Sequence, residues 1–149
     1  MNDKKKLKIV IVEDDPYYNK VLSRYVSSVC TTTLINKNEV EIKSYLSAQD
    51  CIEQLEDDID IMILDYFLPD ENGEDELNGE DVLQEVKKYC PDCKIIMISA
   101  QPDPGIAVEL MHKGIYEYVD KNINTGNRVG SIIQKIILRN VNQPEKLLN

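Results

Sequence analysis

Short apolar runs alternate along this chain with stretches in which apolar residues recur every three or four positions. The runs have the length of strands, and the intervening stretches have the period of amphipathic helices. Five strands are predicted, at about residues 7–12, 40–45, 59–64, 94–98 and 115–119. A helical pattern follows each of them. Since these helices must cover both faces of the sheet, the strands are expected to be parallel and apolar throughout.

The helix predictions rest on cap residues as well as on period. Asp15-Pro16 and Asp103-Pro104 each pair an N-cap residue with proline at the first helical position, and Ser47 and Asn78 are also predicted caps. Residues 31–39 are predicted to form a loop. The apolar faces expected in the five helices are Val21, Leu22, Tyr25, Val26 and Val29; Cys51, Ile52 and Leu55; Val82, Leu83, Val86 and Tyr89; Ile106, Ala107, Leu110 and Met111; and Val129, Ile132, Ile133, Ile136 and Ile137.

The chain has 149 residues, which is a typical length for one domain. The predicted fold is an open, five-stranded, three-layer α/β sandwich over residues 1–140, followed by a tail or the start of a linker at 141–149. There is no apolar run near ~20 residues. The N-terminus also lacks the apolar stretch of a secretory signal. We therefore expect a cytoplasmic protein without membrane contact.

Charge separates one stretch from the rest of the chain. The net charge of −10 argues against nucleic acid as a direct partner. Seven of the 27 acidic residues lie between positions 70 and 81, which contain no lysine or arginine. Most of the imbalance therefore belongs to this acidic stretch.

Polar residues stand at the carboxyl ends of the predicted strands, where open parallel sheets bind their ligands. They are Glu13, Asp14, Asp65, Ser99 and Lys121. Three carboxylates gathered without a cation raise one another's pKa. A hard ion such as Mg²⁺ relieves that repulsion. The ammonium and hydroxyl groups could then bind phosphoryl oxygens, and an aspartate so placed can attack phosphorus.

Five pieces of the chain, in order, resemble the receiver domain of two-component response regulators. They are KIVIVEDDP, IMILDYFLPD, NGEDVLQEV, KIIMISA and GIYEYVDK, and the resemblance extends from about Lys6 to Asn140. It implies a flavodoxin-like (βα)₅ fold with sheet order 2-1-3-4-5. It also implies transfer of phosphate from a partner's phosphohistidine to an aspartate, with Mg²⁺, or Mn²⁺ in its place, as the cofactor.

The resemblance also assigns roles by position. Asp65 matches the phosphoacceptor and Lys121 the phosphate-binding lysine, while Asp15 is one place too late for the acidic pair and remains a helix cap. The remaining implied roles are a metal site of Glu13, Asp14, Asp65 and the Phe67 carbonyl, a switch pair of Ser99 and Tyr118, and two residues flanking the path of an attacking water, Phe67 and Gln101.

The chain departs from the family pattern in two places. Asn122 follows the lysine where the family has a cis proline. Because a cis bond before a non-proline costs ~3 kcal/mol, a trans bond and a looser loop are expected. The family's glycine eight residues after the acceptor is Gly73 by distance but Gly79 by context. Both fit if six residues are inserted, so that the first NGED is loop and the second begins the helix. We expect this insert to select partners, or to be a tolerated loop.

Partners follow from the same resemblance. The phosphoryl donor is expected to be a sensor histidine kinase or a histidine phosphotransfer protein. The face made by the fourth helix, fifth strand and fifth helix is expected to bind a downstream protein or a second copy. Enzyme activity is not expected beyond self-phosphotransfer and slow autodephosphorylation. A dehalogenase-like phosphatase would need an acid where Phe67 stands. A receiver-shaped interaction module that does not use phosphate is the open alternative, and the chain fits either a stand-alone receiver or part of a longer regulator.

Overall fold

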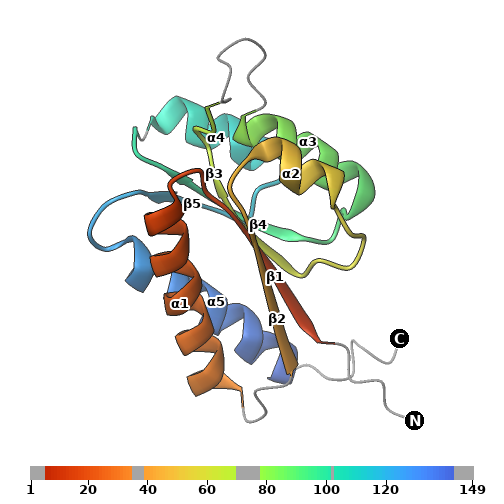
Figure 1. Ribbon diagram of the computed structural model, residues 1–149, viewed down its shortest axis with the longest axis vertical. Helices are drawn as coiled ribbons and strands as arrows, with labels where there is room; N and C mark the ends of the chain where they lie inside the picture. Colours follow the sequence, from red (N-terminus) through yellow and green to blue (C-terminus); the bar gives the residue numbers. More distant parts are fainter. Residues whose placement is uncertain (1–5, 35–38, 70–77, 102, 143–149) are drawn as a thin grey trace.

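Among the described residues, five parallel strands form one sheet in the order β2-β1-β3-β4-β5. Figure 1 shows this sheet nearly edge-on, with helices on both sides of it. The structure is a computed structural model that describes residues 6–34, 39–69, 78–101 and 103–142. The strand bounds are β1 Leu7–Val12, β2 Val40–Tyr45, β3 Ile61–Asp65, β4 Lys94–Ser99 and β5 Glu117–Asp120. The parallel sheet and its order, which the sequence resemblance implied, are confirmed.

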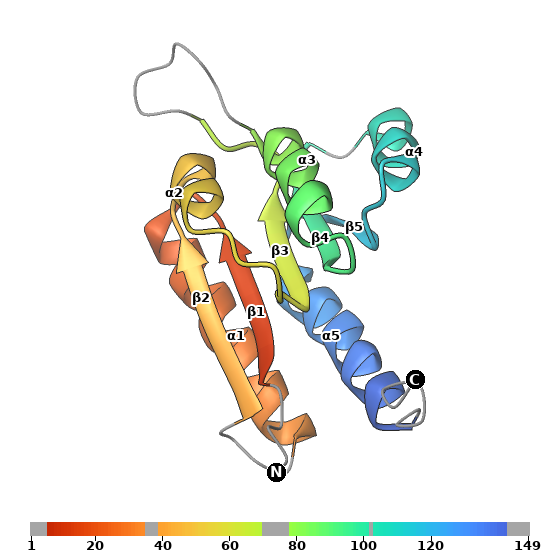
Figure 2. The ribbon, with the colours of Figure 1, turned by 90° about the vertical axis from the view of Figure 1, so that its right-hand side faces the viewer.

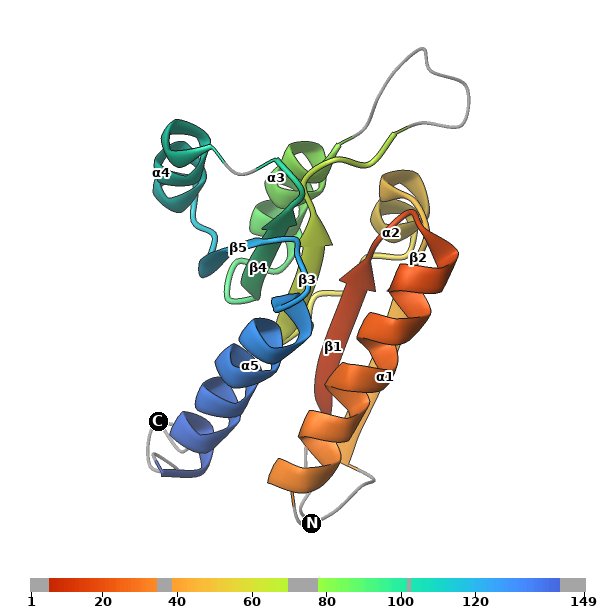
Figure 3. The same cartoon turned by 90° about the vertical axis from the view of Figure 1, so that its left-hand side faces the viewer.

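Helices cover both faces of the sheet, as expected for parallel strands. Figure 2 shows α2 and α3 on one side of it, and Figure 3 shows α1 and α5 together on the other. The helix bounds are α1 Pro16–Thr33, α2 Ala48–Glu53, α3 Gly79–Tyr89, α4 Pro104–His112 and α5 Thr125–Asn142. Among the described residues, none of the helices is both long and apolar enough to pass through a lipid bilayer.

The central strands bury both of their faces. In β3, Met62 and Leu64 belong to the core beneath α2 and α3, whereas Ile61 and Ile63 belong to the core beneath α1 and α5. This alternation follows from the two-residue period of a strand. It explains why the strand sequences are apolar throughout rather than alternately polar.

The predicted caps all begin helices. Asp15 accepts hydrogen bonds from Tyr17 N and Tyr18 N, and Asp103 accepts from Gly105 N and Ile106 N. The Ser47 hydroxyl accepts from Asp50 N. The Asn78 side chain accepts from Glu80 N and Asp81 N while Asp81 accepts from Asn78 N, which completes a capping box. The starts of α1, α2, α3 and α4 could therefore be predicted from short polar signals in the sequence.

The predicted apolar faces were partly wrong. Tyr89 is 62% exposed and Met111 is 49% exposed, and Val21 and Tyr25 are also exposed. The buried face of α1 consists instead of Asn19, Leu22, Val26 and Cys30. The helical period shows which residues share one face of a helix. How many of them are buried depends on how much surface the neighbouring elements offer that face.

Several element ends also differ from the prediction. The first helix continues through Thr33, so residues 31–33 are not loop, and α5 continues through Asn142. β3 begins at Ile61 and β5 at Glu117, each later than the apolar run that predicted it. In both places the start of the apolar run packs into the core as loop rather than as strand, because Ile59 and Ile115 are buried outside the ladder.

Candidate functional site

Strand register brings the predicted site residues to one edge of the sheet. Val12 pairs with Leu64, Asp65 with Ile98, and Ser99 with Asp120. The residues at or just after these strand ends therefore meet at the carboxyl ends of β1, β3, β4 and β5. We call this edge the rim.

Three carboxylates converge at the rim. One oxygen from each of Glu13, Asp14 and Asp65 lies within 4.8 Å of the others. Glu13 and Asp65 are buried, at 0% and 3% exposure, and Asp14 is half-buried. The structure thus brings together the acidic residues that the sequence placed at strand ends.

Hydrogen bonds fix the Glu13 end of this cluster. Asp15 N donates to Glu13 Oε2 at 2.9 Å, and Glu13 N donates to Tyr45 O at 3.1 Å. The amide of the buried Asn19 donates to the carbonyls of Glu13 and Tyr45, at 3.0 Å each. Asn19 was not recognised in the sequence, although its place one turn into α1 aims it at the preceding strand end.

Asp65 lies between a backbone donor and an ammonium. Phe67 N donates to Asp65 Oδ1 at 3.2 Å, and Lys121 Nζ donates to Asp65 Oδ2 at 3.2 Å. Burial raises the pKa of Asp65, against the opposing effect of Lys121. Burial, together with the neighbouring Glu13 carboxylate, also raises the pKa of Asp14. The cluster therefore favours a bound cation at neutral pH.

Lys121 is held on several sides. Its ammonium donates to Glu13 Oε1 as well as to Asp65, and Nζ lies 4.6 Å from the centre of the Tyr18 ring. Burial would lower the pKa of Lys121, but the Glu13 and Asp65 carboxylates outweigh it and raise that pKa. Tyr18 is a site residue that sequence reasoning missed. The available signal was its position in the first turn of α1, three residues after the cap Asp15.

The segment after Lys121 is tied down without a proline. Cis peptide bonds are absent from the described residues, so the predicted trans bond before Asn122 is confirmed. Lys121 N donates to Ser99 O at 2.8 Å. The buried Thr125 hydroxyl accepts from Asn122 N at 2.7 Å and donates to Asp120 O at 2.9 Å. These hydrogen bonds replace part of the rigidity that a proline ring would supply.

Ser99 and Tyr118 lie on neighbouring strands. Ser99 is buried at the end of β4, and its Oγ accepts from Gln101 N at 3.2 Å. Tyr118 is half-buried against the core beneath α2 and α3. Its phenol oxygen is buried and finds no hydrogen-bond partner within the described part of the chain. An unpaired buried hydroxyl is costly, so this side chain is one that another arrangement could stabilise.

Phe67 and Gln101 both lie at the surface of the rim. Phe67 is exposed and packs edge-on against Tyr66, with the ring centroids 4.9 Å apart. Gln101 is exposed beyond β4. The predicted role of the Phe67 backbone carbonyl as a metal ligand stays a prediction.

Gly79 decides between the two NGED copies. A Cβ atom at this position would lie 2.5 Å from Asp65 O and 2.8 Å from Tyr66 Cα, so a side chain does not fit. Gly79 N also donates to Tyr66 O at 3.1 Å. The second copy therefore begins α3, as predicted. Residues 70–77, with the first copy and most of the acidic stretch, lie outside the described residues.

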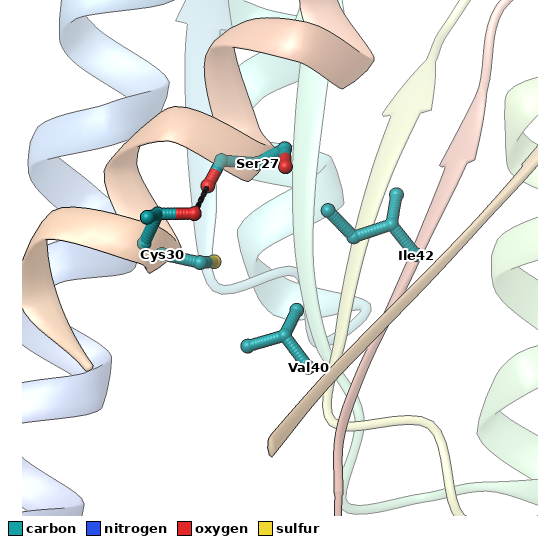
Figure 4. Close-up of a pocket in the computed structure, with 5 residues that line it drawn as sticks. Ser27, Cys30, Val40 and Ile42 are labelled. Carbon is teal, nitrogen blue, oxygen red and sulfur yellow. Dashed lines mark hydrogen bonds between the residues drawn. The ribbon is translucent and has the colours of Figure 1, made fainter. Parts of the chain in front are cut away.

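A cavity of about 220 Å³ lies away from the rim, between α1 and β2 (Figure 4). It is lined by Ser27, Cys30, Thr31, Val40 and Ile42, none of which is charged. Burial raises the pKa of the Cys30 thiol to about 11. A neutral thiol and an uncharged lining give this cavity no chemistry that connects it with the rim.

Comparison with known proteins agrees with the topology. A model of the response regulator receiver domain matches residues 9–133. The DNA-binding transcriptional regulator NtrC of Rhizobium meliloti is 27% identical over 139 residues, which cover 93% of this chain and 26% of that protein. The chain thus spans about a quarter of that relative.

Solved structures show the same fold. A signal receiver domain from Vibrio parahaemolyticus is 23% identical, with a TM-score of 0.74 over 97% of this chain and 98% of its own. A receiver domain from Clostridium thermocellum is 23% identical, with a TM-score of 0.69 over 96% and 99%. The sequence match over most of the chain, together with this likeness, shows that the protein belongs to the family of response regulator receiver domains.

Proposed function

We propose that this domain accepts a phosphoryl group on Asp65, in a reaction that requires Mg²⁺. The donor is the phosphohistidine of a sensor histidine kinase or of a histidine phosphotransfer protein. The observation that carries this proposal is the position of Asp65, which lies beside two further carboxylates and in contact with the Lys121 ammonium. The result is a signal passed to a partner.

The donor set fits a hard divalent cation. It offers only oxygen ligands, and burial raises the pKa of two of its three carboxyl groups. Asp14, Asp65 and the Phe67 carbonyl would hold Mg²⁺ (or Mn²⁺), with Glu13 bound directly or through water. When bound, the ion supplies positive charge that offsets the carboxylates and the phosphoryl oxygens.

Side chains of this domain would carry out the transfer itself. An Asp65 carboxylate oxygen attacks phosphorus, the N–P bond of the phosphohistidine breaks, and the imidazole leaves with the bonding electron pair. Lys121 already donates to Asp65 Oδ2 and transfers that hydrogen bond to a phosphoryl oxygen. The Ser99 hydroxyl binds another. Because Asp65, Lys121 and Ser99 are already close together before the donor binds, less entropy has to be lost to orient them in the transition state.

The donor has to approach a recessed acceptor. Asp65 is only 3% exposed, whereas Ile123, two residues beyond Lys121, is 95% exposed. We place Ile123 and the exposed Phe67 ring in the surface that contacts the histidine-bearing partner. Aromatic side chains such as Phe67 are enriched at the centres of protein interfaces.

Signal output would follow from a change at Ser99. Movement of its hydroxyl toward the phosphoryl group would favour a second arrangement of Tyr118, whose phenol oxygen is buried and unpaired here. The face made by α4, β5 and α5 would then bind a downstream protein or a second copy. Hydrolysis of the phosphoryl group would be slow, because the apolar Phe67 side chain cannot orient an attacking water by a hydrogen bond. Of the two residues predicted to flank the path of that water, Gln101 alone could do so.

Phosphorylation can be tested with a small donor. Wild-type protein is incubated with acetyl phosphate, with and without Mg²⁺, and labelling is measured by intact-mass spectrometry. We expect labelling that needs Mg²⁺, is lost in Asp65→Asn, and is unchanged in the control Asp92→Asn at the opposite end of the sheet. Equal labelling of Asp65→Asn and wild type would refute the acceptor. A wild type that no donor labels would instead indicate an interaction module independent of phosphate.

A further inference from the structure

The Tyr18 ring lies against the Lys121 ammonium. Nζ lies 4.6 Å from the ring centroid, while its hydrogen bonds go to the carboxylates of Glu13 and Asp65. A cation at this distance from an aromatic face is attracted by the ring's electrons. The attraction grows when the pair is shielded from water, and both side chains here are half-buried.

Lysine needs this kind of support more than other phosphate-binding groups. Its ammonium is carried on a flexible four-carbon stem, and fixing that stem costs rotamer entropy. The Lys121 backbone is held through Ser99 O, but a backbone hydrogen bond does not select the direction of the side chain. The adjoining residue is Asn122, so no proline ring stiffens the segment on that side.

Tyr18 is itself well anchored. It lies in the first turn of α1, where its backbone N–H donates to the Asp15 cap. Its ring packs against the core beneath α1 and α5. The ring therefore presents a fixed surface, and the ammonium is confined between that surface and two carboxylates.

We propose that Tyr18 is a positioning residue for Lys121. Its ring keeps the ammonium at the acceptor before phosphoryl transfer, and keeps it within reach of the phosphoryl oxygens afterwards. The second half of this inference rests on the proposed function of Asp65. The first half concerns the unphosphorylated protein alone and can be examined without any donor.

The first test is spectroscopic. Because Lys121 Nζ lies 4.6 Å from the ring centroid in the wild type, we expect ring shielding to move the adjoining ε-methylene resonances upfield of those of an ordinary lysine. Tyr18→Leu should move these resonances to ordinary positions, and Tyr18→Phe should keep them upfield. Tyr17→Leu is the matched control, because Tyr17 adjoins Tyr18 in the helix but is 78% exposed. Unchanged Lys121 resonances in Tyr18→Leu would overturn the inference.

The second test is the rate of labelling by acetyl phosphate at saturating Mg²⁺. We expect Tyr18→Leu to react about fivefold more slowly than wild type, with Tyr18→Phe and Tyr17→Leu close to wild type. Rescue by phenylalanine separates a role of the ring from a role of the hydroxyl. Altered Lys121 resonances with an unaltered rate would show that the ring holds the lysine but would refute the second half of the inference, a role of that position in phosphoryl transfer. If wild type itself is not labelled, the proposed function fails, and the spectroscopic test still decides whether the ring holds the lysine.

Discussion

Gly79 is the residue at which α3 meets the backbone of the acceptor strand. A side chain there would enter space held by main-chain atoms of Asp65 and Tyr66, which cannot rotate away. The duplicated NGED motif concealed this in the sequence, because chain distance favoured Gly73. Local context favoured Gly79, and the packing explains why context was the better guide.

Replacing Gly79 should therefore be costly. Gly79→Ala is expected to lower the free energy of unfolding by about 2–3 kcal/mol, since overpacking against fixed backbone strains the strand end. Urea denaturation measures the change. Gly105→Ala is the control, because its Cβ would meet only the Asp103 side chain, at 3.2 Å, in the first turn of α4. Equal stability of Gly79→Ala and wild type would show that α3 can move away from the strand.

The negative charge of Asp14 lowers the stability of the folded state. Its pKa is raised by burial and by Glu13, so the folded state binds protons more tightly than the unfolded state does. Stability from this group therefore falls as pH rises from the ordinary carboxyl pKa, near ~4, through the raised value. Asp14→Asn removes that cost.

We expect Asp14→Asn to be slightly more stable than wild type at pH 7 without divalent ions, which would raise Tm by about a few degrees at most. The difference should disappear below about pH 4, where wild-type Asp14 is protonated in both states. Added Mg²⁺ should stabilise wild type more than the variant. Thermal melts across pH, with and without Mg²⁺, measure all three effects. A variant less stable than wild type at pH 7 without ions would contradict this account.

At the scale of elements, α4 and α5 differ in how firmly they are packed. Of the residues of α4, all of which the structure describes, only Leu110 is buried. α5 instead buries a full apolar face, consisting of Val129, Ile132, Ile133, Ile136 and Ile137. The sequence showed an apolar stripe in both helices, so period alone could not distinguish them. Both helices contact the edge strand β5, but α5 also packs against α1 and so shares the core beneath the two helices.

Amide exchange should follow this difference in burial. We expect backbone amides of α4 to exchange through local opening, well before those of α5, because opening α4 exposes little apolar surface. Hydrogen exchange followed by NMR at one pH measures both helices in the same sample. Equal protection of the two helices would mean that α4 opens only when the whole domain unfolds.

At the scale of the whole molecule, the rim was predictable because it is built from strand ends. Glu13, Asp65 and Lys121 each follow an apolar run, and parallel pairing is enough to bring them together. Tyr18 and Asn19 were not predictable in the same way. They reach the rim from the first turn of α1, and their contacts depend on how that helix is seated on the sheet. The structure shows that these residues lie together, but their roles remain predictions, those of Asp65 and Lys121 as much as those of Ser99, Tyr118, Phe67 and Gln101.

An ion-pair cluster links β1, β2 and the segment before β3, away from the rim. Lys8 Nζ contacts Glu56 and Asp58, and Lys43 Nζ contacts Glu56 at 2.7 Å. Lys43, and then Lys8, lower the pKa of Glu56. A group with a lowered pKa stabilises the fold above its ordinary pKa and loses that contribution as pH falls through the lowered value.

Glu56→Gln should thus be slightly less stable than wild type at pH 7 and equal to it in acid. The effect should be small and should shrink in high salt, because these side chains are partly exposed. Its direction is opposite to that of Asp14→Asn, so the two variants can be compared in one series of pH melts. A Glu56→Gln variant that is more stable than wild type at pH 7 would contradict the cluster's role.

The contact between Gly79 and Tyr66 also makes the domain a convenient host for protein engineering. The chain leaves β3 and returns to α3 at points joined by one hydrogen bond of 3.1 Å. Because the two ends are already adjacent, lengthening the connection between them costs little, about 0.6 kcal/mol for each doubling. A reporter domain with neighbouring termini could be inserted there without stretching either element. A fluorescent reporter inserted there would lie close to Asp65 in the chain, and a change at Asp65 could then be followed as a change in fluorescence.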